Sequence, residues 1–211
     1  MNVSNLPAYL PCGKPPKVQP LDVFNELSKI QPGKACGPDG IPARLIKMFA
    51  YELSVPFCDI LNCSFAEHQV PQQWKRAIVV PVPKEQPASL GKLRPIALTD
   101  HLAKIAELFI TRWLLSDINY CLDPNQFGSR PGMSTIHCLV DINYLAKCAD
   151  KSTYVSTLIT TDFSKAFDRV DHPVVISKLV DLNPLGWLIP WVADFLIGRT
   201  QCVRYRDCMS D

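Results

Sequence analysis

A run of β-branched residues constrains the fold of this chain more than any other feature. The stretch from Lys75 to Val82 reads KRAIVVPV, is almost continuously apolar, and has no 3.6-residue period. Such a run is typical of a strand. The segment LRPIAL, residues 93–98, predicts a second short strand, and its proline favours an edge position in the sheet. The polar residues 84–92 form the turn between them, so a hairpin is expected near the middle of the chain.

Helical periodicity dominates the rest of the chain. Residues 1–20 hold five of the 19 prolines and predict an extended lead-in, with the fold starting after it. Apolar spacing predicts helices over residues 21–30, 42–53, 55–68, 100–122, 135–149, 173–182 and 187–197, and further strands over 153–162 and 200–206. Mixed elements of this kind indicate an α+β fold.

Helical spacing also predicts which side chains face the core, and Asp100 is placed to cap the long helix. The residues expected on buried helix faces are Val23, Leu27, Ile30, Leu45, Ile46, Phe49, Leu53, Ile60, Leu61 and Phe65.

Composition excludes several classes of protein. With 47% hydrophobic residues over 211 positions the chain can build a core, and its net charge of +2 gives no general attraction to polyanions. The nine cysteines form no C-x-x-C pair, which argues against a zinc site and for free thiols. The longest apolar run is short and interrupted by Asp194, so no membrane span is expected. These features indicate an intracellular chain without a leader.

The stretch TTDFSKAFDRVDH, residues 160–172, is unusually acidic for a segment that follows a predicted strand. Asp162 stands at the carboxyl end of that strand. Asp168 lies about 20 Å further along an extended chain, so the two carboxylates cannot hold one metal without a turn between them. A lone carboxylate binds Mg²⁺ weakly, so any metal ligands beside Asp162 must come from elsewhere. In the alternative interpretation Asp162 caps a turn, and Phe163 and Phe167 belong to the core.

Four ordered segments resemble the reverse transcriptases of non-LTR, LINE-like retrotransposons. The resemblance covers the chain from about residue 18 to its end and implies a right-hand polymerase with fingers, palm and thumb. By this resemblance residues 21–152 form the fingers and 153–211 an incomplete palm. The segments are GPDGIP (37–42), VPQQWKRAIVVPVPK (70–84) leading to LRPIALT (93–99), QFGSRPGMST (126–135) and TDFSKAFDRVDH (161–172).

The resemblance also implies roles for single residues. Asp162 and the backbone carbonyl of Phe163 would bind Mg²⁺, of which the complete enzyme uses two ions, and Phe167 would exclude the ribose 2′-hydroxyl. Arg94 and Lys84 would bind the phosphates of the incoming dNTP, unless they belong to a solvated hairpin face.

The implied polymer partners are an RNA template and a DNA primer. Gln126 and Arg130 would contact the template, although a scaffold role is equally open. Ser134 is placed to cap the next helix, whereas His137 and His172 receive no role. The family resemblance also implies a nuclear location.

Two later palm motifs of this family are absent from the sequence: the GVPQG-like turn and the paired-aspartate hairpin. Metal binding is therefore expected to be weak or absent, and polymerisation by this chain alone undetectable. An exposed palm strand would favour self-association. One alternative is a catalytically inert nucleic-acid-binding remnant; another is a Mg²⁺-dependent phosphohydrolase built on Asp162.

Overall fold

The computed structural model describes residues 13–85, 92–150, 157–163, 166–182 and 185–210. It divides into two compact units. Unit 1 consists of Met1–Asp117 with His172–Asp211, and unit 2 consists of Ile118–Asp171. The fold is mixed α+β, as predicted.

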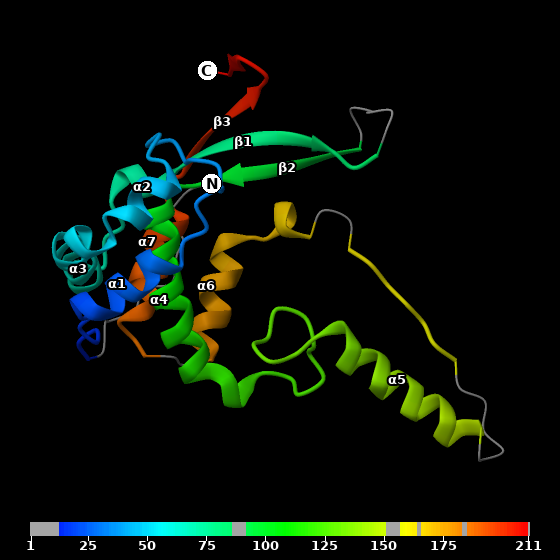
Figure 1. Ribbon diagram of the computed structural model, residues 1–211. Coiled ribbons are helices and arrows are strands. Elements are labelled where there is room, and N and C mark those ends of the chain that lie inside the picture. Colours follow the sequence, from blue (N-terminus) through cyan, green and yellow to red (C-terminus); the bar gives the residue numbers. More distant parts are fainter. Residues whose placement is uncertain (1–12, 86–91, 151–156, 164–165, 183–184, 211) are drawn as a thin grey trace. The chain divides into compact units, whose positions relative to one another are not determined.

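A four-stranded mixed sheet belongs to unit 1 (Figure 1). Strands β1 (Arg76–Pro83) and β2 (Leu93–Leu98) form the predicted hairpin, with β2 at the edge of the order β2-β1-β3-β4. Strand β3 (Thr200–Tyr205), also predicted, pairs parallel with β1 and antiparallel with β4 (Cys208–Met209). The sheet therefore joins segments that are far apart in the sequence.

Helices supply most of the core of unit 1. An aromatic cluster joins Phe65 to Trp113 and Trp191, with ring centroids 5.2 and 6.0 Å away. Trp113 also meets Trp187 at 5.3 Å. The helices are α1 (Pro20–Lys29), α2 (Ala43–Met48), α3 (Ala50–Glu67), α4 (His101–Ile118), α6 (His172–Asp181) and α7 (Leu188–Leu196). No helix within the described ranges is long and apolar enough to cross a membrane.

The break between α2 and α3 differs from the prediction. It falls at Phe49, which has non-helical φ and ψ of −100° and 28°, and α3 continues through Pro56. The buried faces of α2 and α3 also differ from the prediction. Leu45, Phe49 and Ile60 are 44%, 46% and 49% exposed, so the prediction that they face the core is wrong.

The remaining core predictions for these helices hold. Ile46, Leu61 and Phe65 are buried, and Leu53 packs against the core from a partly buried position. Val23 and Leu27 of α1 are fully buried, as predicted.

The lead-in enters the core before α1 begins. Residues 1–12 lie outside the described part of the chain, but Val18 is buried. Its N–H donates to Oδ1 of Asn62 at 2.9 Å, and its carbonyl accepts from Nδ2 of the same side chain at 3.0 Å. Paired side-chain bonds of this kind satisfy the backbone of a segment that has no secondary structure. Val18 is therefore part of the core although it precedes α1.

Unit 2 contains α5 (Thr135–Asp150), as predicted, and the short 3₁₀ helices η4 (Asn119–Cys121) and η5 (Phe167–Arg169). The strand predicted over 153–162 is not found in its described part. Residues 157–163 are extended without strand pairing, and Leu158 and Ile159 are 68% and 81% exposed. A β-propensity run becomes a strand only beside a partner strand, and the described residues offer none here.

Candidate nucleotide and metal site

Asp162 and Phe163 lie in the extended segment of unit 2, and both are exposed. The carboxylate of Asp162 has no hydrogen-bond or ion-pair partner among the described residues, so the turn-capping interpretation has no contact to support it. Phe163 is 83% exposed. The Asp162 carboxylate is therefore accessible rather than sealed in an interior.

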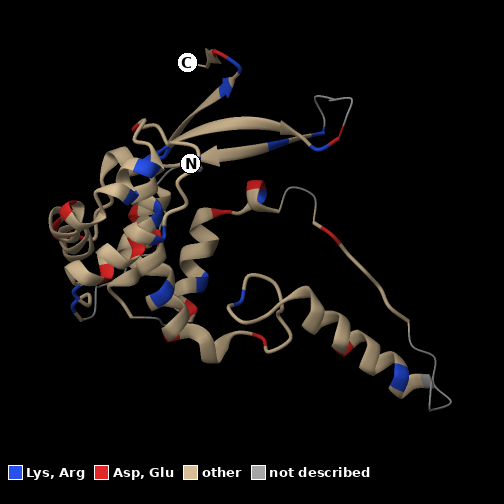
Figure 2. Cartoon of the chain, in the orientation of Figure 1, with Lys and Arg blue, Asp and Glu red and all other residues tan. Residues whose placement is uncertain are grey.

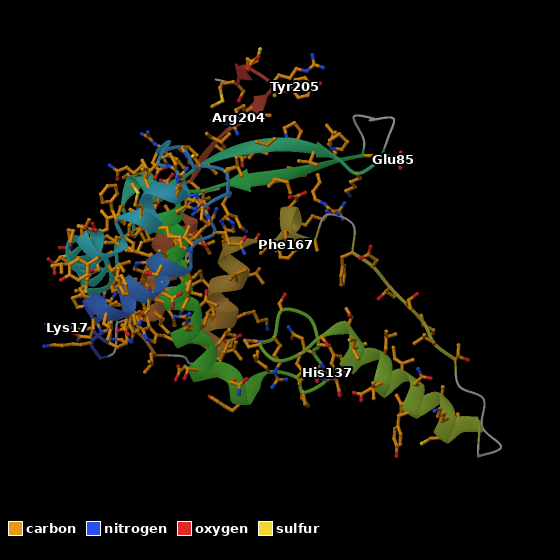
Figure 3. All side chains as sticks on the ribbon, viewed as in Figure 1. Lys17, Glu85, His137, Phe167, Arg204 and Tyr205 are labelled. Atoms are coloured by element: carbon orange, nitrogen blue, oxygen red, sulfur yellow. The ribbon has the colours of Figure 1, made fainter. Side chains whose placement is uncertain are left out.

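Phe167 begins the 3₁₀ helix η5 and is 94% exposed (Figure 3). Within unit 2 neither Phe163 nor Phe167 occupies a core position, which counts against the core interpretation of both. An aromatic ring held this open on a helical turn can act as a steric barrier to a ligand.

Arg94 and Lys84 lie near the turn end of the β1–β2 hairpin. Arg94 pairs with Val82 across the strands, and the N–H of Lys84 extends the ladder by donating to the carbonyl of Lys92 at 2.9 Å. Side chains alternate between the faces of a strand, so Lys84 shares the face of Val82 and Arg94, about 7 Å further along. Both cations are exposed. The hairpin thus brings together two cations that are ten positions apart in the sequence.

Gln126 and Arg130 are engaged within their own loop. Arg130 Nη1 donates to the carbonyl of Asp123 at 3.0 Å, and Gln126 Nε2 donates to the carbonyl of Gly128 at 3.3 Å. These bonds support the scaffold interpretation. Ser134 precedes α5, and its Oγ lies 3.0 Å from Nδ1 of His137.

Asp100 anchors the loop GPDGIP, although the sequence predicted this residue only as a helix cap. Asp100 is 2% exposed and accepts a hydrogen bond at 3.1 Å from the backbone N–H of Asp39. A Cβ on Gly37 would lie 2.7 Å from the Asp100 Cα, so only glycine fits there. The structure therefore fixes this loop against the start of α4.

Burial shifts two titratable groups at this anchor. It raises the pKa of Asp100, an effect that the Asp39 N–H partly offsets by stabilising the carboxylate. Burial lowers the pKa of His101, as does the charge of Lys104. The Nε2 atom of His101 is buried and has no hydrogen-bond partner in the described part of the chain. Both the lowered pKa and the unpartnered Nε2 of His101 favour the neutral imidazole.

The described residues do not form a complete magnesium site. They contain no group of three or more His, Cys, Asp or Glu side chains that could hold a metal ion. Mg²⁺ requires six oxygen ligands in an octahedron. Asp162 and the carbonyl of Phe163 fit this chemistry in type, but provide three oxygens at most.

The candidate residues fall into two sets. Arg94 and Lys84 belong to unit 1, whereas Asp162, Phe167 and the Gln126–Arg130 loop belong to unit 2. Each unit thus carries one part of the set expected from the motifs: two exposed cations in one, a carboxylate and an exposed aromatic ring in the other.

Comparison with known families decides what these motifs are. The model of the reverse transcriptase (RNA-dependent DNA polymerase) family matches residues 82–208, more than half of the chain. The chain belongs to the reverse transcriptase family. The match includes Lys84, Arg94, Asp162 and Phe167. Complete reverse transcriptases act with Mg²⁺ on a template, a primer and dNTPs.

The curated relatives of this chain include polymerases of non-LTR elements, to which this chain is homologous. It is 28% identical over 206 residues to the probable RNA-directed DNA polymerase from transposon BS of Drosophila melanogaster, covering 93% of this chain and 22% of that protein. It is 29% identical over 186 residues to the RNA-directed DNA polymerase from mobile element jockey of the same species, covering 85% and 20%.

The Pol polyprotein of the type-1 element R1 of Bradysia coprophila is 26% identical over 204 residues, covering 90% of this chain and 20% of that protein. The chain thus spans about a fifth of the length of these relatives.

Proposed function

We propose that this chain is the nucleotide-binding part of an RNA-directed DNA polymerase, comprising the fingers and the first half of the palm. In the full-length enzyme it takes part in templated nucleotidyl transfer from a dNTP to a primer 3′-hydroxyl. The observation that carries the proposal is the match to the reverse transcriptase family over residues 82–208. The right-hand subdomain bounds, 21–152 and 153–211, belong to this proposal and differ from those of the two compact units.

The cations of the hairpin bind the triphosphate in this proposal. Arg94 and Lys84 share one exposed face, and neither has a carboxylate partner within the described residues. Two uncompensated cations about 7 Å apart match the charge and reach of a polyphosphate. They offset the negative charge that develops on the leaving pyrophosphate.

Asp162 and the carbonyl of Phe163 provide two of the oxygen ligands of Mg²⁺. Bound magnesium supplies charge stabilisation to the phosphates. Phe167 presents an exposed ring five residues after Asp162, and its bulk excludes a ribose 2′-hydroxyl from the nucleotide site. Gln126 and Arg130 hold the loop that borders the template.

Nucleotide binding tests the proposal without requiring polymerisation. We expect fluorescent dATP to bind the purified chain in Mg²⁺. Removing a charged phosphate contact costs about 1.5–3 kcal/mol, so Arg94→Gln should weaken binding by about ten- to a hundredfold. Arg94→Lys keeps the charge and should weaken binding less. Phe167→Ala should reduce the preference for dATP over ATP. The exposed Arg44→Gln is the matched control. Unchanged affinity in Arg94→Gln together with unchanged selectivity in Phe167→Ala would refute the proposal.

A nucleic-acid-binding function without catalysis is the second candidate, because the described residues lack a complete metal site. It predicts that an RNA:DNA duplex binds equally well to the wild-type chain and to Asp162→Asn. Loss of duplex binding in that variant would count against it.

A further inference from the structure

Helices α1 and α3 form an open apolar groove on the surface of unit 1. The two helices run antiparallel. Val18, just before α1, bonds to Asn62 in the second half of α3, whereas the Phe24 ring meets Tyr51 at the start of α3, with ring centroids 6.5 Å apart. The groove has a volume of about 560 Å³. Side chains from both helices line it, among them Leu21, Phe24, Tyr51, Glu52 and Val55.

The apolar side chains of this groove are open to solvent. Leu21, Tyr51 and Val55 are 67%, 77% and 56% exposed, and Phe24 is only partly buried. Large apolar side chains that gather on one continuous surface are typical of an interaction site. A groove between two packed helices is one of the forms in which proteins bind a third helix. The shape of the site therefore indicates a helical partner.

The charged side chains that α3 presents are all acidic. Its 18 residues include Glu52, Asp59 and Glu67 but no lysine or arginine, and Figure 2 shows this helix without basic residues. A solvated helix face normally mixes both signs. Glu52, Val55 and Asp59 are spaced by three and four residues, so they share one stripe. Neither Glu52 nor Asp59 has an ion-pair partner within the described residues.

The Cys58 thiol lies in the negative potential between the two helices. Burial is the main cause that raises its pKa, and the charges of Asp59 and Asp22 raise it further, against a hydrogen bond from Asn62 that lowers it. Asp59 belongs to α3 and Asp22 to α1, and both carboxylates are exposed. Acidic groups from both helices therefore act on the same place.

Lysines near α3 lie at its opposite end. Lys14 and Lys17 line a separate pocket of about 380 Å³ together with Ala66. Ala66 is about 20 Å from Glu52 along the helix, which is more than the distance over which physiological salt screens exposed charges. These lysines therefore leave the acidic charge beside the groove uncompensated.

We propose that the groove between α1 and α3 docks an amphipathic, basic α-helix of a partner protein. Its apolar side chains insert between Leu21, Tyr51 and Val55, and its lysines or arginines lie beside Glu52 and Asp59. The carboxylates repel phosphates, so this surface selects a protein rather than a nucleic acid. Two copies of the same surface would bring like charges together, which disfavours a symmetric dimer. The inference goes beyond the proposed function and does not depend on it.

A designed peptide tests this inference. The probe is a fluorescein-labelled helix of about 15 residues with leucine at i, i+3, i+4 and i+7 and lysine elsewhere, and anisotropy gives its Kd for the purified chain. We expect Leu21→Ser to weaken binding about tenfold, because burial of a leucine side chain contributes on that order. Glu52→Gln combined with Asp59→Asn should weaken binding about fivefold at low salt and less at high salt.

Matched substitutions on α5 provide the controls. Tyr51→Ala should weaken binding, whereas Tyr144→Ala, at a tyrosine that is 67% exposed, should leave it unchanged. Asp141→Asn, at an exposed aspartate, should also leave binding unchanged. All substituted side chains are exposed, so urea denaturation should give the wild-type midpoint for every variant.

Three outcomes would overturn the inference: no peptide binding by the wild-type chain, equal binding of a peptide with glutamate in place of lysine, or unchanged affinity in both Leu21→Ser and Tyr51→Ala. Photo-leucine in the peptide tests the site without substitutions, and crosslinks confined to segments outside α1 and α3 would also refute it. Self-association of the wild-type chain that Leu21→Ser abolishes would make a second copy the occupant, against the proposal.

Nucleotide binding separates this result from the proposed function. Leu21→Ser should weaken peptide binding and leave the affinity for dATP at its wild-type value. Loss of both affinities in that variant would mean that the groove is not an independent site.

Discussion

Lys75 Nζ lies 2.8 Å from Oδ1 of Asp194, a residue 119 positions away in the sequence. The lysine side chain is 4% exposed, and the other carboxylate oxygen accepts the backbone N–H of Val70 at 2.6 Å. One carboxylate on α7 thus holds both ends of the segment that leads into β1. Strand β1 begins directly after Lys75 and forms the hairpin that carries Arg94. This ion pair therefore anchors the start of that hairpin.

Removing either partner of this ion pair should destabilise unit 1, but the two substitutions should differ in cost. Asp194→Ala leaves a buried ammonium without a partner and should cost about 3 kcal/mol, whereas Lys75→Met leaves Asp194 bonded to Val70 and should cost less. Urea denaturation measures both. Lys178→Met, in an exposed pair with a separation of 3.9 Å, is the control and should change the free energy of unfolding by less than about 0.5 kcal/mol. Equal effects at positions 75 and 194 would contradict the assignment.

Gly37 is required by its contact with Asp100. Because a Cβ at this position would overlap the Asp100 backbone, Gly37→Ala should destabilise the fold by about 1–3 kcal/mol. Gly33→Ala is a matched control in the same loop, since a Cβ there meets nothing within 4 Å. Thermal unfolding of the two variants makes the comparison, and a tolerated Gly37→Ala would mean that the loop does not rest on α4.

We expect the protein to lose stability on acidification because of His101. Burial lowers its pKa in the folded state, so the unfolded chain takes up a proton that the folded chain resists. The free energy of unfolding should therefore fall as the pH drops through about 6.5, by at most about 1.4 kcal/mol per pH unit. His101→Leu should flatten this dependence between pH 7.5 and 5.5, whereas the exposed-site control His137→Gln should retain it. Chemical denaturation at several pH values gives the slopes.

Glu26 should cause a second loss of stability at a more acidic pH. Burial raises its pKa, but hydrogen bonds from Arg112 and Lys29, each at 3.0 Å, outweigh burial and lower it overall. The stabilisation is therefore present above the unfolded pKa of about 4.5 and is lost as the pH falls through the lower folded value. Arg112→Met should reduce stability at pH 7 and shrink the acid-induced loss. If the acid-induced loss of stability is unchanged in that variant, Glu26 does not cause that loss.

The β1–β2 hairpin and most helices were predictable because their signals are local. The run KRAIVVPV and the edge proline of LRPIAL were enough for β1 and β2, and 3.6-residue periodicity was enough for α1, α4 and α5. The break at Phe49 was missed because packing, not propensity, sets the helical phase on each side. The strand expected before Asp162 failed in its described part because strands depend on partners that the local sequence does not contain.

The candidate site, like the fold, was predictable from the sequence only in part. The sequence alone determined the motifs, and with them the family, because each motif is a short segment whose residues occur at a fixed spacing. Only the tertiary structure decided that Asp194 pairs with Lys75, that Asp100 requires Gly37, and that Arg94 and Lys84 share a face of the hairpin. Contacts between distant segments depend on strand register and helix phase, which are settled only when the whole core packs.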